Sequence, residues 1–129
     1  MTTELQMLAL SALLALAQML IAVVGAMAQV GLPTLAGNRE GLAEPTGWAG
    51  RARRAHLNML ESLAIFAIAV LVVHLADRSS DTTALGAALF FWARLAYAAV
   101  YLAGIPWLRT GVWFVSVVGL AIIFAQLWL

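Results

Sequence analysis

Residues 5–38 read LQMLALSALLALAQMLIAVVGAMAQVGLPTLAGN, and none of these 34 side chains is charged. A transmembrane helix needs about 20 consecutive apolar residues, so the stretch is long enough for one membrane span and a following loop. A cleaved signal peptide has a basic start and a shorter apolar core of roughly 7–15 residues. Here the only charge before the stretch is Glu4. We therefore interpret it as a retained transmembrane helix.

The rest of the chain has the same character. Of its 129 residues, 64% are hydrophobic and 10% are charged, whereas soluble domains carry about 25% charged residues. This composition excludes an ordinary soluble domain, a coiled coil and a disordered chain. The formal net charge of +1 is too balanced for a nucleic-acid-binding surface. The absence of cysteine excludes disulfides and thiolate metal sites, and two isolated histidines make no metal site.

Polar segments divide the sequence into four apolar stretches. We expect an all-α polytopic membrane protein, a four-transmembrane-helix bundle that fills residues 1–129 as a single domain. Thr46 is a plausible N-cap of the second helix. The predicted helices cover residues 5–32, 48–76, 83–105 and 112–129, with a polar turn at 77–81 and a tight connection from Pro106 to Gly111.

The short loops predict the orientation, because cytoplasmic loops carry an excess of basic residues. Five arginines lie in or beside the loops after the first and third predicted helices, and one lies on the opposite side. We therefore expect those two loops in the cytoplasm and both termini on the other side. The five are Arg39, Arg51, Arg53, Arg54 and Arg109, and the single one is Arg78.

Polar side chains share one face on each of two predicted helices. At 100° per residue, four of them lie within about 80° on the second helix, and three lie within about 60° on the third. The first set is Arg51, Arg54, Asn58 and Glu61; the second is Arg94, Tyr97 and Tyr101.

A charge at the centre of a bilayer costs about 2.5–3.5 kcal/mol, so Arg94 should face the protein interior and be paired. Glu61 is its natural partner, within one chain or between chains. One interpretation is that this pair only fixes the helix register. The other is a pocket for a polar anion with one amino group, in which arginines bind carboxylates and Glu61 binds an ammonium, while Asn58 and the two tyrosines supply neutral hydrogen bonds. Glutathione, a peptide-like dianion, has those groups.

Two motifs in this order resemble a known family. The second predicted helix carries Arg51-Ala-Arg-Arg-Ala-His-Leu-Asn-Met-Leu-Glu61. The third carries Arg94-x-x-Tyr97-x-x-x-Tyr101, followed at residues 104–110 by Gly-Ile-Pro-Trp-Leu-Arg-Thr. Together they resemble the MAPEG family, the membrane-associated proteins in eicosanoid and glutathione metabolism. Residues 37–40, Gly-Asn-Arg-Glu, resemble the first loop of its bacterial branch.

The resemblance implies a homotrimer in the bacterial inner membrane, with glutathione as co-substrate bound between protomers. The implied activity is that of a glutathione-dependent transferase or peroxidase on lipophilic electrophiles or hydroperoxides. Arg109 would be catalytic, because a nearby cation in a dry site lowers the pKa of the glutathione thiol and favours the nucleophilic thiolate. The implied glutathione-binding residues are Arg51, Arg54, Asn58, Glu61, Arg94, Tyr97, Tyr101 and Thr110.

Two alternatives remain open. Gln29 stands where the family often has an arginine, and Leu57 replaces a basic residue common in its eukaryotic enzymes. These differences favour a non-catalytic membrane protein that binds glutathione or lipid. A small four-helix transporter is the other alternative. Exporters of this size use a membrane-embedded glutamate in the first helix, but the first helix here has no charge beyond Glu4.

Overall fold

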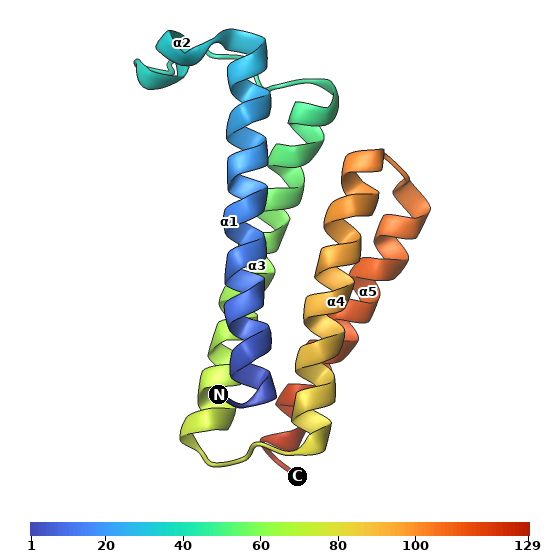
Figure 1. Ribbon diagram of the computed structural model, residues 1–129. Coiled ribbons are helices and arrows are strands. Elements are labelled where there is room, and N and C mark those ends of the chain that lie inside the picture. Colours follow the sequence, from blue (N-terminus) through green and yellow to red (C-terminus); the bar gives the residue numbers. More distant parts are fainter.

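The structure, a computed structural model, describes residues 1–129 as helices joined by short connections (Figure 1). Four of the helices are long and apolar enough to cross a membrane. The chain is therefore an all-α membrane protein, which confirms the predicted fold class. The helices are α1 (Thr3–Val30), α2 (Leu32–Ala36), α3 (Gly47–Leu75), α4 (Asp81–Ala103) and α5 (Pro106–Gln126).

The long helices form two pairs, α1 with α3 and α4 with α5, which lie against each other along the bundle (Figure 1). Both termini lie at the end where α3 connects to α4. The opposite end carries α2, the start of α3 and the turn between α4 and α5. We call it the arginine end, because it carries five of the seven arginines: Arg39, Arg51, Arg53, Arg54 and Arg109.

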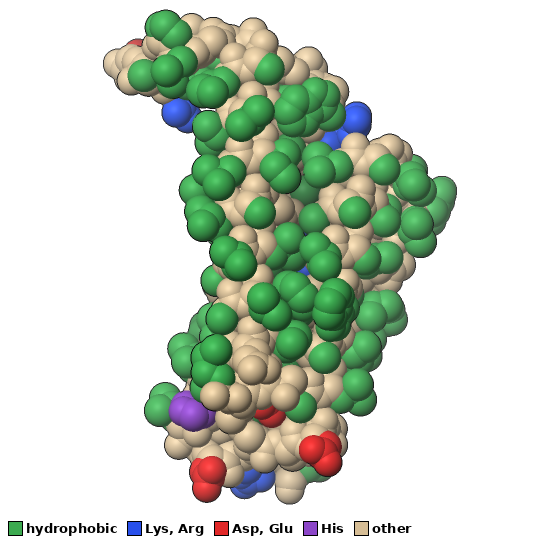
Figure 2. Space-filling view, viewed as in Figure 1, with side chains coloured by type: hydrophobic (Ala, Val, Ile, Leu, Met, Phe, Trp, Pro, Cys, Tyr) green, Lys and Arg blue, Asp and Glu red, His purple; other side chains and the backbone are tan.

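The core lies between the two pairs. Phe66 of α3 stacks on Phe90 of α4 with a centroid distance of 4.0 Å, and both side chains are fully buried. Helices α4 and α5 approach closely at two glycines, since a Cβ on Gly119 would lie 2.6 Å from the carbonyl oxygen of Gly86. Apolar side chains also cover the outside along the length of the bundle (Figure 2), as lipid contact requires.

Helix α5 begins earlier than the sequence predicted. Residues 106–111 were expected as a connection before a helix at 112–129, but they form the first turns of a helix that ends at Gln126. Proline is favourable at the first helical position, because its fixed φ suits the helix and that position needs no N–H donor. Arg109 and Thr110 therefore lie on a helix instead of in a connection between helices.

Thr46 stands at the N-cap position of α3, but its side chain makes no capping hydrogen bond. Its backbone is bound instead by the side-chain amide of Gln29. Gln29 Nε2 donates to Thr46 O at 2.7 Å, and Thr46 N donates to Gln29 Oε1 at 3.0 Å. This pair of bonds ties the last turn of α1 to the start of α3 across the loop that contains α2.

Candidate functional site

The candidate site lies on the faces that α3, α4 and α5 turn toward one another at and below the arginine end. On α3, Arg54 and Asn58 are four residues apart, so their side chains lie one above the other. On α4, Tyr97 and Tyr101 have the same spacing and pack with a centroid distance of 5.5 Å. Both tyrosines are buried, so α4 offers a continuous aromatic wall to α3.

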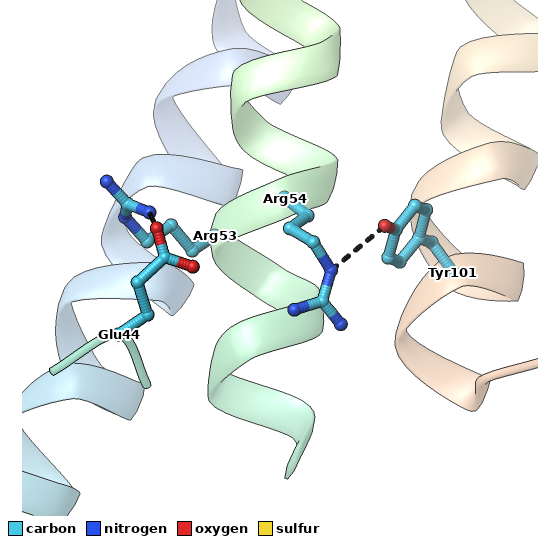
Figure 3. Close-up of polar contacts among 4 residues, drawn as sticks. All are labelled: Glu44, Arg53, Arg54 and Tyr101. Atoms are coloured by element: carbon cyan, nitrogen blue, oxygen red, sulfur yellow. Dashed lines mark hydrogen bonds and ion pairs between the residues drawn. The ribbon is translucent and has the colours of Figure 1, made fainter. Parts of the chain in front are cut away.

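Two arginines from different helices meet on one tyrosine. Arg54 Nε donates a hydrogen bond of 3.2 Å to the Tyr101 hydroxyl, as Figure 3 shows. The guanidinium carbon of Arg109 lies 4.6 Å from the centroid of the Tyr101 ring, a cation–π contact. The only ion pair in the chain is that between Arg53 and Glu44. Arg54 and Arg109 therefore gather positive charge without a carboxylate beside it.

A third arginine lies against the turn that follows α4. Arg51 Nε donates to the Leu102 carbonyl oxygen at 3.0 Å. Gly104 ends the helix in the left-handed conformation with φ of 78°, which glycine adopts without steric cost. A Cβ on Gly104 would lie 3.6 Å from Arg51 Nε, so this turn packs closely on the guanidinium.

Deeper in the bundle, Arg94 is almost fully buried, at 1% exposure. Its Nη2 donates to Asn58 Oδ1 at 2.7 Å, and its guanidinium carbon lies 4.3 Å from the centroid of the Tyr97 ring. The Nε and Nη1 atoms are buried and have no hydrogen-bond partner. Because unpaired buried donors are costly, this guanidinium is only partly satisfied within the chain.

The structure thus joins most of the predicted residues into one continuous set of contacts. The Tyr97–Tyr101 packing links the upper cluster to the deeper one, and Arg51 lies beside the upper cluster at the end of α4. The contacting residues are Arg54, Asn58, Arg94, Tyr97, Tyr101 and Arg109.

Two predicted residues stand apart from this set. Glu61 is exposed and makes no hydrogen bond or ion pair, so the predicted pairing of Glu61 with Arg94 inside one chain is wrong. Asn58, one turn earlier on the same face of α3, takes the place at Arg94. Thr110 is also exposed, and its Oγ1 donates to the Pro106 carbonyl oxygen at 3.2 Å within its own helix.

A buried carboxylate at the opposite end of the bundle has a role that was not predicted from the sequence. Glu4 is 3% exposed, and Thr83 Oγ1 donates to its Oε1 at 2.5 Å. This bond ties the start of α1 to the start of α4. The available signal was the Ser80–Thr83 capping box, which fixes the position of the Thr83 hydroxyl. The contact is remote from the arginine end and is structural.

A bundle of apolar, membrane-spanning helices that carries clustered arginines and tyrosines at one end defines a class of integral membrane proteins. The MAPEG family model matches residues 4–129, so the chain belongs to the MAPEG family. Membership gives it a glutathione-related role in membranes, of the transferase or peroxidase type in general. No curated protein and no solved structure matches the chain.

Proposed function

We propose that the protein is an integral membrane glutathione transferase or peroxidase that acts on lipophilic electrophiles or hydroperoxides. Family membership supports the general role. The observation that carries the proposal is the meeting of Arg54 and Arg109 on Tyr101, with no carboxylate beside either guanidinium. Such a cluster suits a ligand that brings its own negative charges, as glutathione does through two carboxylates and a thiolate.

In the proposed mechanism, Arg51 and Arg54 bind the carboxylates of glutathione, and Arg109 lies beside its sulfur. The Arg109 charge favours the thiolate, which is the nucleophile. The sulfur forms a bond to an electrophilic carbon while the leaving group departs with its electron pair. With a hydroperoxide, the sulfur attacks the outer peroxide oxygen and the alkoxide leaves as an alcohol. A second glutathione then reduces the resulting sulfenic acid, giving glutathione disulfide and water.

We further propose that the site is completed in a homotrimer, with glutathione between neighbouring protomers. Glu61 is exposed although it lies in a helix that can span the membrane. Because ionisable groups inside a membrane are almost always paired, we expect Glu61 to face a basic side chain of a neighbouring protomer. We place the arginine end on the cytoplasmic side of the bacterial inner membrane.

The direct test is thermal unfolding of the purified protein in detergent with and without glutathione. A ligand at ten times its Kd stabilises the folded state by about 1.4 kcal/mol, so millimolar glutathione should raise Tm. The double variant Arg54→Ala/Arg109→Ala should lose this increase. Arg78→Ala, at the opposite end of the bundle, is the matched control and should keep it. If millimolar glutathione leaves the wild-type Tm unchanged, the proposal is wrong.

One observation favours the second candidate, a glutathione-binding protein without turnover. The side chain of Gln29 is occupied by the backbone of Thr46, and it brings no positive charge where the family often has an arginine. This candidate predicts stabilisation by glutathione without conjugation or reduction across a panel of electrophiles and hydroperoxides. Measurable turnover that depends on Arg109 would reject it.

A further inference from the structure

A cavity lies on the other side of α3 from the candidate glutathione site. This cavity of about 550 Å³ is open on one side and is lined by the last turns of α1, by α2 with its loop, and by α3. Arg53 and Arg54 are consecutive, yet Figure 3 shows Arg53 directed to Glu44 and Arg54 directed to Tyr101. The body of α3 therefore separates the cavity from the arginine–tyrosine cluster.

The walls of the cavity are apolar over the length of a lipid chain. On α1 they run from Met19 to Val30, which at 1.5 Å per residue is about 16 Å. The hydrocarbon core of a bilayer is about 30 Å thick, so this wall covers about one leaflet. The cavity volume also falls within the range of about 300–1,000 Å³ that is common for ligand pockets.

The rim at the arginine end is polar and carries more positive than negative charge. Arg39, Arg53 and Glu44 line it. One carboxylate oxygen of Glu44 binds Arg53 Nη1 at 2.8 Å, and Arg39 uses its Nε on the Leu35 carbonyl oxygen at 2.8 Å. The remaining guanidinium N–H groups make no other hydrogen bond within the chain. His56 also lines the cavity, and its Nδ1 is buried without a partner.

We propose that this cavity binds an anionic phospholipid, with its phosphate at Arg39, Arg53 and His56 and an acyl chain along the α1 wall. Guanidinium forks match phosphate oxygens in geometry and charge. The apolar wall on α1 begins directly beneath the basic side chains of the rim. One amphiphile with a negative headgroup can therefore bind both the rim and the apolar wall. Because α3 separates the cavity from Arg109, the lipid is a bound component and not the electrophile. The proposal does not depend on glutathione binding.

The experiment uses the purified protein in nanodiscs that contain phosphatidylglycerol or phosphatidylcholine with a photoreactive diazirine in one acyl chain. After illumination, mass spectrometry of peptides measures how much lipid is attached to residues 19–30. We expect several-fold more attachment with phosphatidylglycerol. An arginine near the membrane surface adds about 1 kcal/mol of attraction to anionic lipid. Arg39→Gln/Arg53→Gln should therefore lower this attachment about tenfold or more, whereas Arg78→Gln should leave it unchanged.

A second variant separates a lost charge from a lost fold. Ala26→Phe fills the apolar part of the cavity and keeps every rim charge, so it should also lower attachment at residues 19–30. In each variant, a Tm and a circular dichroism spectrum equal to those of the wild type without ligand show that the bundle is intact. Equal attachment of the two lipids, or undiminished attachment in Arg39→Gln/Arg53→Gln, would overturn the lipid site. Neither outcome would affect the proposed glutathione activity.

Discussion

Tyr101 is the residue on which the candidate site depends. Its hydroxyl accepts a hydrogen bond from Arg54, its ring lies under Arg109, and its other ring neighbour is Tyr97. The hydroxyl and the ring thus hold different arginines, one from α3 and one from α5. Because the two contacts use different parts of one side chain, substitutions can separate them.

Tyr101→Phe removes the hydroxyl and keeps the ring. A single hydrogen bond contributes about 0.5–1.5 kcal/mol, so we expect the Kd for glutathione to rise about 3- to 10-fold, measured by titration calorimetry. The thiolate absorbance of bound glutathione should persist, because Arg109 keeps its aromatic support. Tyr101→Ala, the matched variant, should lose affinity and thiolate absorbance together. If Tyr101→Phe also abolished the thiolate, the division of roles would be wrong.

Helical spacing alone predicted which side chains face one another here. Arg54 and Tyr101 meet because each lies on the polar face of its helix. Spacing did not predict the exact register between the helices, so it could not tell that Asn58 and not Glu61 would bind Arg94. That choice depends on how far α3 and α4 slide along each other, which is determined by core packing such as Phe66 on Phe90.

Among the helices, the four long ones were predicted by hydropathy. Segments that span lipid must be apolar throughout, and a helix satisfies its own backbone hydrogen bonds there. Hydropathy missed α2, because five residues are too few to show a helical period. It also placed the start of α5 too late, because residues 106–111 were expected as a tight connection. At the first position of α5, Pro106 starts the helix and thereby positions Arg109 over Tyr101.

The α4–α5 pair depends on two glycines that bring the helices close together. A Cβ on Gly119 would lie 2.6 Å from Gly86 O and 2.9 Å from Phe90 N. We expect Gly119→Ala to lower the free energy of unfolding by about 1–3 kcal/mol, measured by denaturant titration in mild detergent. Gly111→Ala is the matched control on the same helix, since a Cβ there meets nothing within 4 Å. Alanine should stabilise that position by about 0.5–1 kcal/mol, and equal stabilisation by both variants would contradict the close packing.

The whole molecule leaves one carboxylate of a membrane-spanning helix without a partner. Glu61 is exposed and makes no hydrogen bond or ion pair. In the proposed trimer, a basic side chain of a neighbouring protomer would pair with it. The sequence predicted that such charges should be paired but not where, because hydropathy does not distinguish a protein neighbour from lipid.

This pairing predicts a specific pattern in the oligomeric state. Breaking a buried ion pair by removing one partner costs about 3–5 kcal/mol. Glu61→Gln should therefore reduce the trimer fraction, measured by light scattering after size exclusion. Glu40→Gln, in the loop, is the control and should remain trimeric. A monomeric wild type, or an undiminished trimer fraction in Glu61→Gln, would contradict the pairing.

Arg109 is proposed to stabilise the thiolate of bound glutathione, and ultraviolet difference spectroscopy measures that thiolate directly. Lowering the pKa of the glutathione thiol by about 2 corresponds to about 2.7 kcal/mol, reasonable for one well-placed arginine. With saturating glutathione at neutral pH, the wild-type protein should show the thiolate band. Arg109→Ala should lose the band, and Arg78→Ala should keep it. An equally strong band in Arg109→Ala, or no band in a wild type shown to bind glutathione, would contradict the proposed role of Arg109.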